Sequence, residues 1–217
     1  MMSLQQMQEI IAVPHAPFDG EEPWSAPPRC TPVRLRRATD GTTPRLATSV
    51  AVWFDEEYLT VLFSASDDHI EASYLDHDAS LYEQDVVEVF LGSDDPTRYV
   101  ELEANPRGTM FDALIDSPHG VREGLRADRS WTCEGLWTAV RIESESSGMM
   151  SVDIVIRIPF AGLGRTVPVD GETWRANFFR IDRHPEQGDE FSAWQPTMKE
   201  PADFHVAAAF GSLRFTV

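Results

Sequence analysis

Short runs of alternating apolar and polar residues, separated by turn residues, are the feature that most limits how this chain can fold. A period of two is typical of a strand with one buried face, and β-branched and aromatic residues favour strands. Such runs occupy residues 47–54, 58–66, 85–92, 98–104, 108–115, 136–143, 151–158, 173–181 and 211–217, and residues 33–37 form a further candidate. No long segment has a clean helical period; residues 4–11 alone suggest a short helix or an arm.

About ten strands without alternating helices predict an all-β fold, an antiparallel β-sandwich of immunoglobulin or jelly-roll type. The chain has 217 residues, 42% of them hydrophobic, which is enough for one well-packed core. Prolines are frequent in residues 14–32 and favour extended chain there. We therefore expect an extended N-terminal arm, residues 1–17, followed by one sandwich domain, residues 18–217.

The charge balance limits the partners of the chain. Asp and Glu number 36 against 18 Lys and Arg, which gives a formal net charge of −18. Such a chain repels phosphate backbones and anionic membranes, so we expect no nucleic-acid partner. No apolar run approaches the roughly 20 residues of a membrane span, and the first residues lack the pattern of a secretory signal peptide.

Common catalytic motifs are absent from the sequence: there is no G-x-S-x-G, no P-loop, no G-x-G-x-x-G and no H-E-x-x-H. Carboxylates nevertheless lie within predicted strands. Glu101 and Glu103 share one face of their strand, and Glu88 shares a face with apolar neighbours, where burial is costly without hydrogen-bond partners. Glycosidases use paired carboxylates in catalysis, so one hypothesis is a glycoside hydrolase that uses Glu88, Glu101 or Glu103. The alternative is that these residues belong to acidic strands at the surface and have no catalytic role.

Two cysteines, Cys30 and Cys133, are too few for a disulfide scaffold. They are either two buried thiols or a single bridge.

Six stretches, in order, carry a resemblance to a known family: Phe18–Trp24, Ala47–Val61, Tyr82–Leu91, Trp174–Phe178, Ser192–Pro196 and Phe210–Phe215. Together they are similar to the family 9 carbohydrate-binding module, a β-sandwich domain first known from xylanases, over residues 18–217. The resemblance implies non-catalytic binding of an oligosaccharide or polysaccharide end, accessory to polysaccharide catabolism. It also implies an extracellular or periplasmic location.

In that family two aromatic rings grip a sugar at one end of the sandwich, because the apolar C–H face of a pyranose suits the face of an aromatic ring. The resemblance places the two rings at Tyr82 and Phe204 and the hydroxyl-binding glutamate at Glu88. The family's arginine falls on Glu101 and its asparagine on Pro201, so a different sugar, or a ligand that is not a sugar, fits as well.

Three further expectations remain open. Trp194, near a strand end, is a candidate for either the ligand site or the core. Because family members hold calcium, the acidic segment suggests a cation at Asp67, Asp68, Asp76 and Asp78, although the spacing is not that of an EF-hand. Similar sandwiches carry heme in redox proteins, and Met198, Lys199 and His205 are the candidate axial ligands for that alternative.

Overall fold

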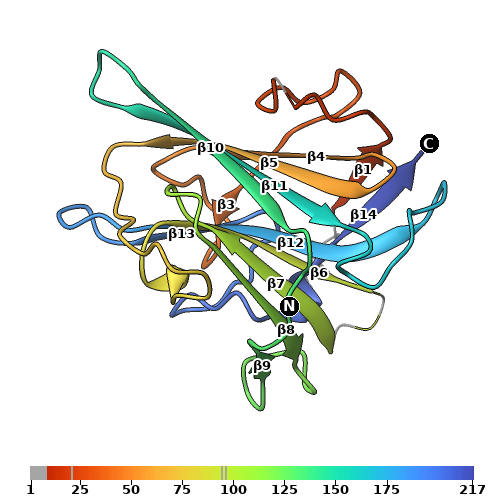
Figure 1. Cartoon of the computed structure of the whole chain (residues 1–217). Coiled ribbons are helices and arrows are strands. Elements are labelled where there is room, and N and C mark those ends of the chain that lie inside the picture. Colours follow the sequence, from red (N-terminus) through yellow and green to blue (C-terminus); the bar gives the residue numbers. More distant parts are fainter. Residues whose placement is uncertain (1–8, 21, 94, 96) are drawn as a thin grey trace.

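The computed structural model describes residues 9–20, 22–93, 95 and 97–217, which form two β-sheets packed face to face (Figure 1). The smaller sheet has five strands in the order β10-β11-β5-β4-β2, all antiparallel. Their bounds are β2 Val33–Arg34, β4 Thr48–Phe54, β5 Tyr58–Asp67, β10 Trp137–Ser144 and β11 Met150–Pro159.

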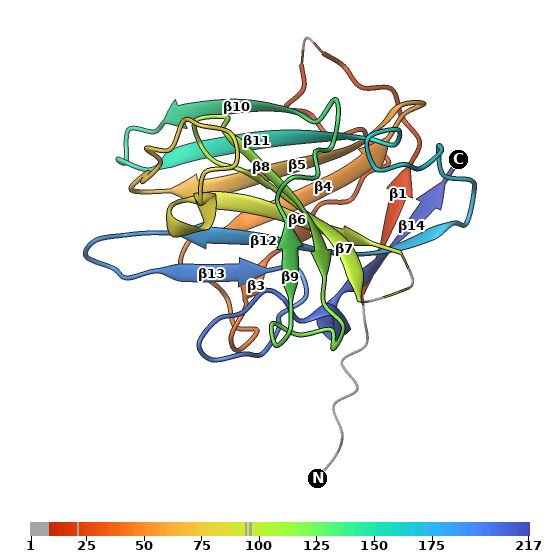
Figure 2. The ribbon, with the colours of Figure 1, turned by 60° about the horizontal axis from the view of Figure 1, so that its bottom comes forward.

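The larger sheet has nine strands, with the main order β1-β14-β12-β6-β7-β8-β9, while β13 pairs with β12 and β3 with β13 (Figure 2). The strand β1 runs parallel to β14, and the other neighbours in this sheet are antiparallel. The bounds are β1 Ile10–Pro14, β3 Arg36–Arg37, β6 Val86–Gly92, β7 Arg98–Ala104, β8 Met110–Asp116, β9 Arg126–Asp128, β12 Thr173–Asp182, β13 Glu190–Ala193 and β14 Gly211–Thr216. Two short 3-10 turns, η1 Leu81–Glu83 and η2 Ala207–Ala209, complete the described elements.

Residue alternation within the large sheet separates two apolar regions. In β6, Val87, Val89 and Leu91 face the smaller sheet and join the main core between the two layers. The residues between them, Val86 and Phe90, belong to a second apolar cluster on the outer face of the same sheet. Strands β7, β8 and β12 follow the same rule, because successive side chains of a strand point to opposite faces. The large sheet is therefore covered on both faces.

The outer face of the large sheet is covered by chain segments that contain almost no regular structure. The segment around η1 contributes Leu81, and the segment around η2 contributes Phe204, Ala207 and Phe210. These segments come from distant parts of the sequence, and they enclose a space above β6, β7 and β8.

The predicted all-β sandwich is confirmed, and each of the ten predicted runs coincides with one or two strands. The strands that the alternation does not reveal are β1, β9 and β13. They have three to five residues, and β9 is exposed throughout, so they show no run of buried apolar positions.

The predicted N-terminal arm differs in part from the structure. Ile10–Pro14 forms the strand β1, and Ile11 and Val13 lie in the main core, so the sheet begins before residue 18. The predicted short helix or arm at residues 4–11 lies mostly outside the described residues. Cys30 and Cys133 are two buried free thiols in separate apolar clusters, which is one of the two alternatives that the sequence leaves open.

Among the residues that the structure describes, no helix has the length and apolar character needed to cross a membrane.

Candidate functional site

A cavity of about 310 Å³ lies against the outer face of the large sheet. Its floor is formed by side chains of four neighbouring strands, among them Glu88 of β6, Glu101 of β7 and Phe111 of β8. A volume near the lower end of the range of about 300–1,000 Å³ that is typical of small-molecule sites suits one or two sugar units better than a long chain. The resemblance implied a site at one end of the sandwich; the cavity instead lies over a sheet face, because the outward side chains of β6, β7 and β8 form its base.

The two predicted aromatic residues, Tyr82 and Phe204, both line this cavity although they lie far apart in the chain. Tyr82 belongs to η1 and is 45% exposed. Phe204 is 6% exposed and stacks on Phe179 of β12, with ring centroids 4.2 Å apart and an interplanar angle of 13°. Tyr82 is therefore a ring presented at the surface, whereas Phe204 is a ring held rigidly against the sheet.

The position of Tyr82 is fixed through its backbone. Arg183, which directly follows β12, donates a hydrogen bond from Nη2 to the carbonyl oxygen of Tyr82 at 2.7 Å. The other end of the Arg183 guanidinium pairs with Asp189, and its Cζ lies 5.1 Å from the centroid of the Phe191 ring. Arg183 thus links η1 to the end of the large sheet at the cavity wall.

Three carboxyl groups meet at the base of the cavity. The strand register places Glu88 opposite Glu103 and Phe90 opposite Glu101. One oxygen of each glutamate lies within 4.8 Å of the others, and all three residues are buried, with exposed fractions of 2%, 8% and 1% for Glu88, Glu101 and Glu103. Glu88 and Glu101 line the cavity, whereas Glu103 does not. The sequence prediction that Glu101 and Glu103 share a face is confirmed.

Burial makes these carboxyls hard to ionise, because a low-dielectric interior disfavours the charged form. Burial, and next the charge of Glu101, raise the pKa of Glu88 well above its ordinary value. Burial raises the pKa of Glu101 to about 7, and the positive charge of Arg122 opposes the shift. Burial, together with the charges of Glu88 and Glu101, also raises the pKa of Glu103 well above its ordinary value. The cluster therefore retains protons at a pH where exposed carboxyls have lost theirs.

These raised pKa values predict a pH dependence of stability. A carboxyl whose pKa is higher in the folded than in the unfolded state stabilises the fold fully below its unfolded pKa, and this contribution is lost as the pH rises through its folded pKa. Replacing Glu103 by glutamine removes the charge and keeps the shape. Near pH 4, the free energy of unfolding of Glu103→Gln should therefore be close to that of the unchanged protein. Near pH 8, Glu103→Gln should be the more stable of the two, by about 1.4 kcal/mol for each unit by which folding raises the pKa of Glu103.

Urea-induced unfolding, followed by tryptophan fluorescence at several pH values, measures this difference. The matched control is Glu143→Gln on β10, where the glutamate side chain is 65% exposed and no such gain is expected. If the free energies of unfolding of Glu103→Gln and of the unchanged protein change in parallel with pH, Glu103 has the same pKa in the folded and the unfolded state.

Three arginines that the sequence analysis did not select, Arg122, Arg129 and Arg183, also line the cavity. Arg122 donates from Nε to Asp203 Oδ1 at 2.9 Å, and Arg129 lies with its Cζ 5.1 Å from the centroid of the Phe111 ring. The family's arginine position is Glu101 here, and the guanidinium groups at this cavity come from these three residues and not from β7. A signal was present: Arg122, Arg126 and Arg129 stand within eight residues of a chain with few basic residues.

His205 lines the cavity and is held by Tyr99, whose hydroxyl lies 2.9 Å from His205 Nδ1. Burial lowers the pKa of His205 to about 4, so its ring is neutral at physiological pH. Met198 is 54% exposed and does not line the cavity, and neither does Lys199. The three candidate heme ligands are therefore not gathered at this cavity.

Trp194 is 1% exposed and lies in the main core, where its ring packs near Phe178 at a centroid distance of 5.6 Å. Its Nε1 donates to Glu9 at 3.1 Å. The structure thus gives Trp194 the core position, and does not bring it to the cavity with the other four predicted ligand residues.

The four calcium candidates are not gathered at one place. Asp67 pairs with Arg180 at 2.8 Å, and Asp68 pairs with Arg45. Among the described residues, no group of three neighbouring acidic and histidine side chains contains two of the four candidates, and Asp76 belongs to none of these groups. Because arginines already neutralise two of these carboxylates, the set does not fit a single calcium ion.

Comparisons with known proteins agree with this architecture. The family model described as carbohydrate-binding family 9 matches residues 41–215. An extracellular protein of Arthroderma benhamiae is 23% identical over 206 residues, covering 89% of this chain and 87% of that protein.

Solved structures show the same fold. A proposed carbohydrate-binding protein from Bacteroides uniformis has a TM-score of 0.75 and 19% identity, covering 96% of this chain and 99% of its own. A family 9 carbohydrate-binding module from Caldicellulosiruptor kristjanssonii in complex with cellotriose has a TM-score of 0.61 and 13% identity, over 96% and 94%. The glucose complex has the same TM-score at 12% identity, over 96% of both chains. Because the family model matches residues 41–215, which is most of this chain, the chain belongs to carbohydrate-binding family 9.

Proposed function

We propose that the protein binds the end of an oligosaccharide or polysaccharide in the cavity over the large sheet. One observation carries the proposal. Tyr82 and Glu88 lie close together in the chain and Phe204 lies far from both, yet these three residues, to which the resemblance assigns sugar binding, line one cavity. The family 9 module from Caldicellulosiruptor kristjanssonii was solved with glucose and with cellotriose, which supports a sugar as the ligand.

The lining of the cavity suits the two kinds of surface that a sugar ring presents. Tyr82 and Phe204 offer aromatic faces for the apolar C–H groups. Glu88 and Glu101 offer oxygens, and the three arginines offer N–H donors, for hydroxyl groups that would cost about 1–3 kcal/mol each if left unpaired in a dry site. Because the donors come from Arg122, Arg129 and Arg183 and not from β7, the preferred sugar or linkage is expected to differ from that of family members with an arginine there.

Binding without cleavage is the form of this function that the carboxyl geometry favours. A glycosidase needs two carboxyl groups on opposite sides of the scissile bond. Glu88, Glu101 and Glu103 instead project from one sheet face, within 4.8 Å of one another, and Glu103 does not line the cavity. Such a group can hold hydroxyls from one side, as an accessory protein in polysaccharide breakdown would require.

Isothermal titration with glucose, cellotriose and xylotriose tests the proposal, alongside an assay for released reducing sugar. We expect heat of binding from at least one of these probes and no release of reducing sugar. Release that disappears in Glu88→Gln would support the glycoside hydrolase hypothesis instead. An absorption band of bound heme after purification would support the redox alternative. If none of the three probes gives heat of binding, that result would count against glucose-based and xylose-based sugars as ligands.

A further inference from the structure

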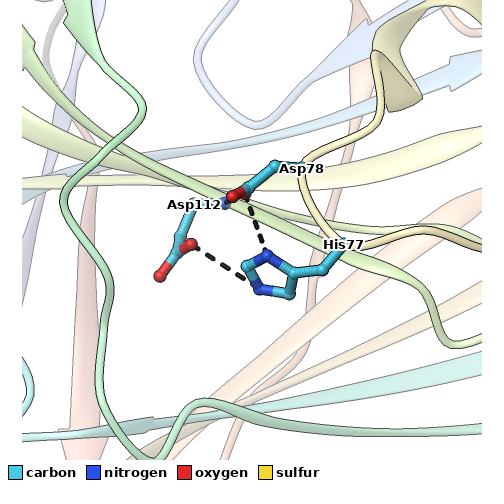
Figure 3. A group of neighbouring side chains, drawn as sticks. All are labelled: His77, Asp78 and Asp112. Atoms are coloured by element: carbon cyan, nitrogen blue, oxygen red, sulfur yellow. Dashed lines mark hydrogen bonds and ion pairs between the residues drawn. The ribbon is translucent and has the colours of Figure 1, made fainter.

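His77, Asp78 and Asp112 form a cluster outside the cavity (Figure 3). His77 and Asp78 belong to the segment between β5 and η1, and Asp112 lies in the middle of β8. His77 Nε2 is 3.7 Å from Asp112 Oδ1, and His77 Nδ1 is 3.1 Å from Asp78 Oδ1. One potential ligand atom of each residue lies within 4.8 Å of the other two.

An ion pair with His77 does not by itself explain the surroundings of the Asp112 carboxylate. Its side chain is 1% exposed, and its Oδ2 accepts the backbone N–H of Cys133. Its Oδ1 is buried and has no hydrogen-bond partner among the described residues, although it faces the His77 ring (Figure 3). A buried carboxylate oxygen without a partner is costly, and a cation between Asp112 and His77 would remove that cost.

The ligand types point to a particular class of metal. Calcium and magnesium prefer sites built only from oxygen ligands, whereas an imidazole nitrogen combined with carboxylates suits zinc and related first-row metals. The His77 side chain is 46% exposed and that of Asp78 is 33% exposed, so an ion has access from solvent, and water can complete its coordination. An exposed histidine can also turn to bring its nitrogen to bonding distance.

We propose that His77, Asp78 and Asp112 bind a divalent transition metal of the zinc class. This site is separate from the cavity, because Asp112 and the cavity residue Phe111 point to opposite faces of β8. It is nevertheless connected to the cavity, since Arg129, which lines the cavity, donates to the backbone carbonyl of Asp78. A metal bound here would link the segment before η1 to β8.

Titration of the full chain, freed of metal with a chelator, tests this site. With ZnCl₂ we expect one ion per chain, an increase in melting temperature, and much weaker binding of CaCl₂. His77→Gln should weaken zinc binding at least tenfold and remove the increase in melting temperature. Asp112→Asn should do the same, but because Asp112 also accepts a hydrogen bond from Cys133, His77→Gln is the variant that decides.

Two other histidine variants serve as controls. His119→Gln changes an exposed histidine outside the cluster. His184→Gln changes another histidine that could bind zinc. Its ring centroid lies 5.2 Å from that of His69, and its Nε2 lies 3.8 Å from Asp68. Both should bind zinc like the unchanged protein. The proposal is overturned if His77→Gln binds zinc normally, if calcium binds as tightly as zinc, or if the unchanged chain binds no zinc.

Discussion

Replacing Tyr82 by alanine is expected to lower the affinity for the sugar by about thirtyfold, which corresponds to about 2 kcal/mol. Tyr82 is the exposed ring of the cavity, at 45% exposure, so it can reach a ligand that enters from solvent. Phe204 is already stacked on Phe179, and its contribution to binding is harder to separate from its contribution to the fold. Removal of the Tyr82 ring leaves one face of the bound sugar open to water.

The fold should tolerate this change, because the structure holds Tyr82 through its backbone carbonyl and not through its ring. The matched control is Trp137→Ala on β10 of the other sheet, where the ring is 42% exposed and lies away from the cavity. Tyr82→Trp introduces the tryptophan that the family resemblance aligns with this position, and it should bind at least as tightly as the unchanged protein. Titration with whichever probe binds the unchanged chain gives the three affinities, and retained affinity in Tyr82→Ala would exclude the proposed aromatic site.

The architecture could be predicted from the sequence because it depends on a local pattern. In β6 and β7 the apolar residues that face the other sheet alternate with the residues of the outer face, and this period of two is visible without any knowledge of the fold. The strand β9 could not be predicted in the same way. Arg126, Ala127 and Asp128 become a strand only because the edge of β8 accepts them, which is a tertiary effect.

The candidate site was predictable only in part. Glu88 and Tyr82 could be assigned by resemblance, because both stand in a well-matched stretch of sequence. The clustering of Arg122 and Arg129 in the sequence did not by itself place them at the cavity, since their approach to it depends on how the segments on either side of β9 fold back over the large sheet. For Trp194 the sequence left both the ligand site and the core open, because its position directly after β13 does not reveal that its ring turns into the core.

The largest expected loss of stability comes from Arg180, which joins the two sheets. This arginine of β12 is 5% exposed. Its Nη1 donates to Thr48 Oγ1 and to the carbonyl oxygen of Ser66, at 3.1 Å and 2.9 Å. Its Nη2 donates to Asp67 at 2.8 Å and to Asp182 at 3.3 Å. Arg180→Met would leave two buried carboxylates without this partner, and it should lower the free energy of unfolding by about 3–5 kcal/mol.

Urea-induced unfolding measures this loss, and two comparisons identify its cause. Arg37→Met breaks an exposed pair with Asp40, in which the side chains are 48% and 51% exposed, and should leave the free energy of unfolding nearly unchanged. Adding Asp67→Asn to Arg180→Met should recover part of the loss, because it removes one of the unpaired charges. The deficit should also shrink as the pH falls, since a buried carboxylate left without its arginine has a raised pKa and becomes neutral on protonation. A deficit that neither the second substitution nor lower pH reduces would mean that Arg180 stabilises the fold through the packing of its side chain and not through its charge.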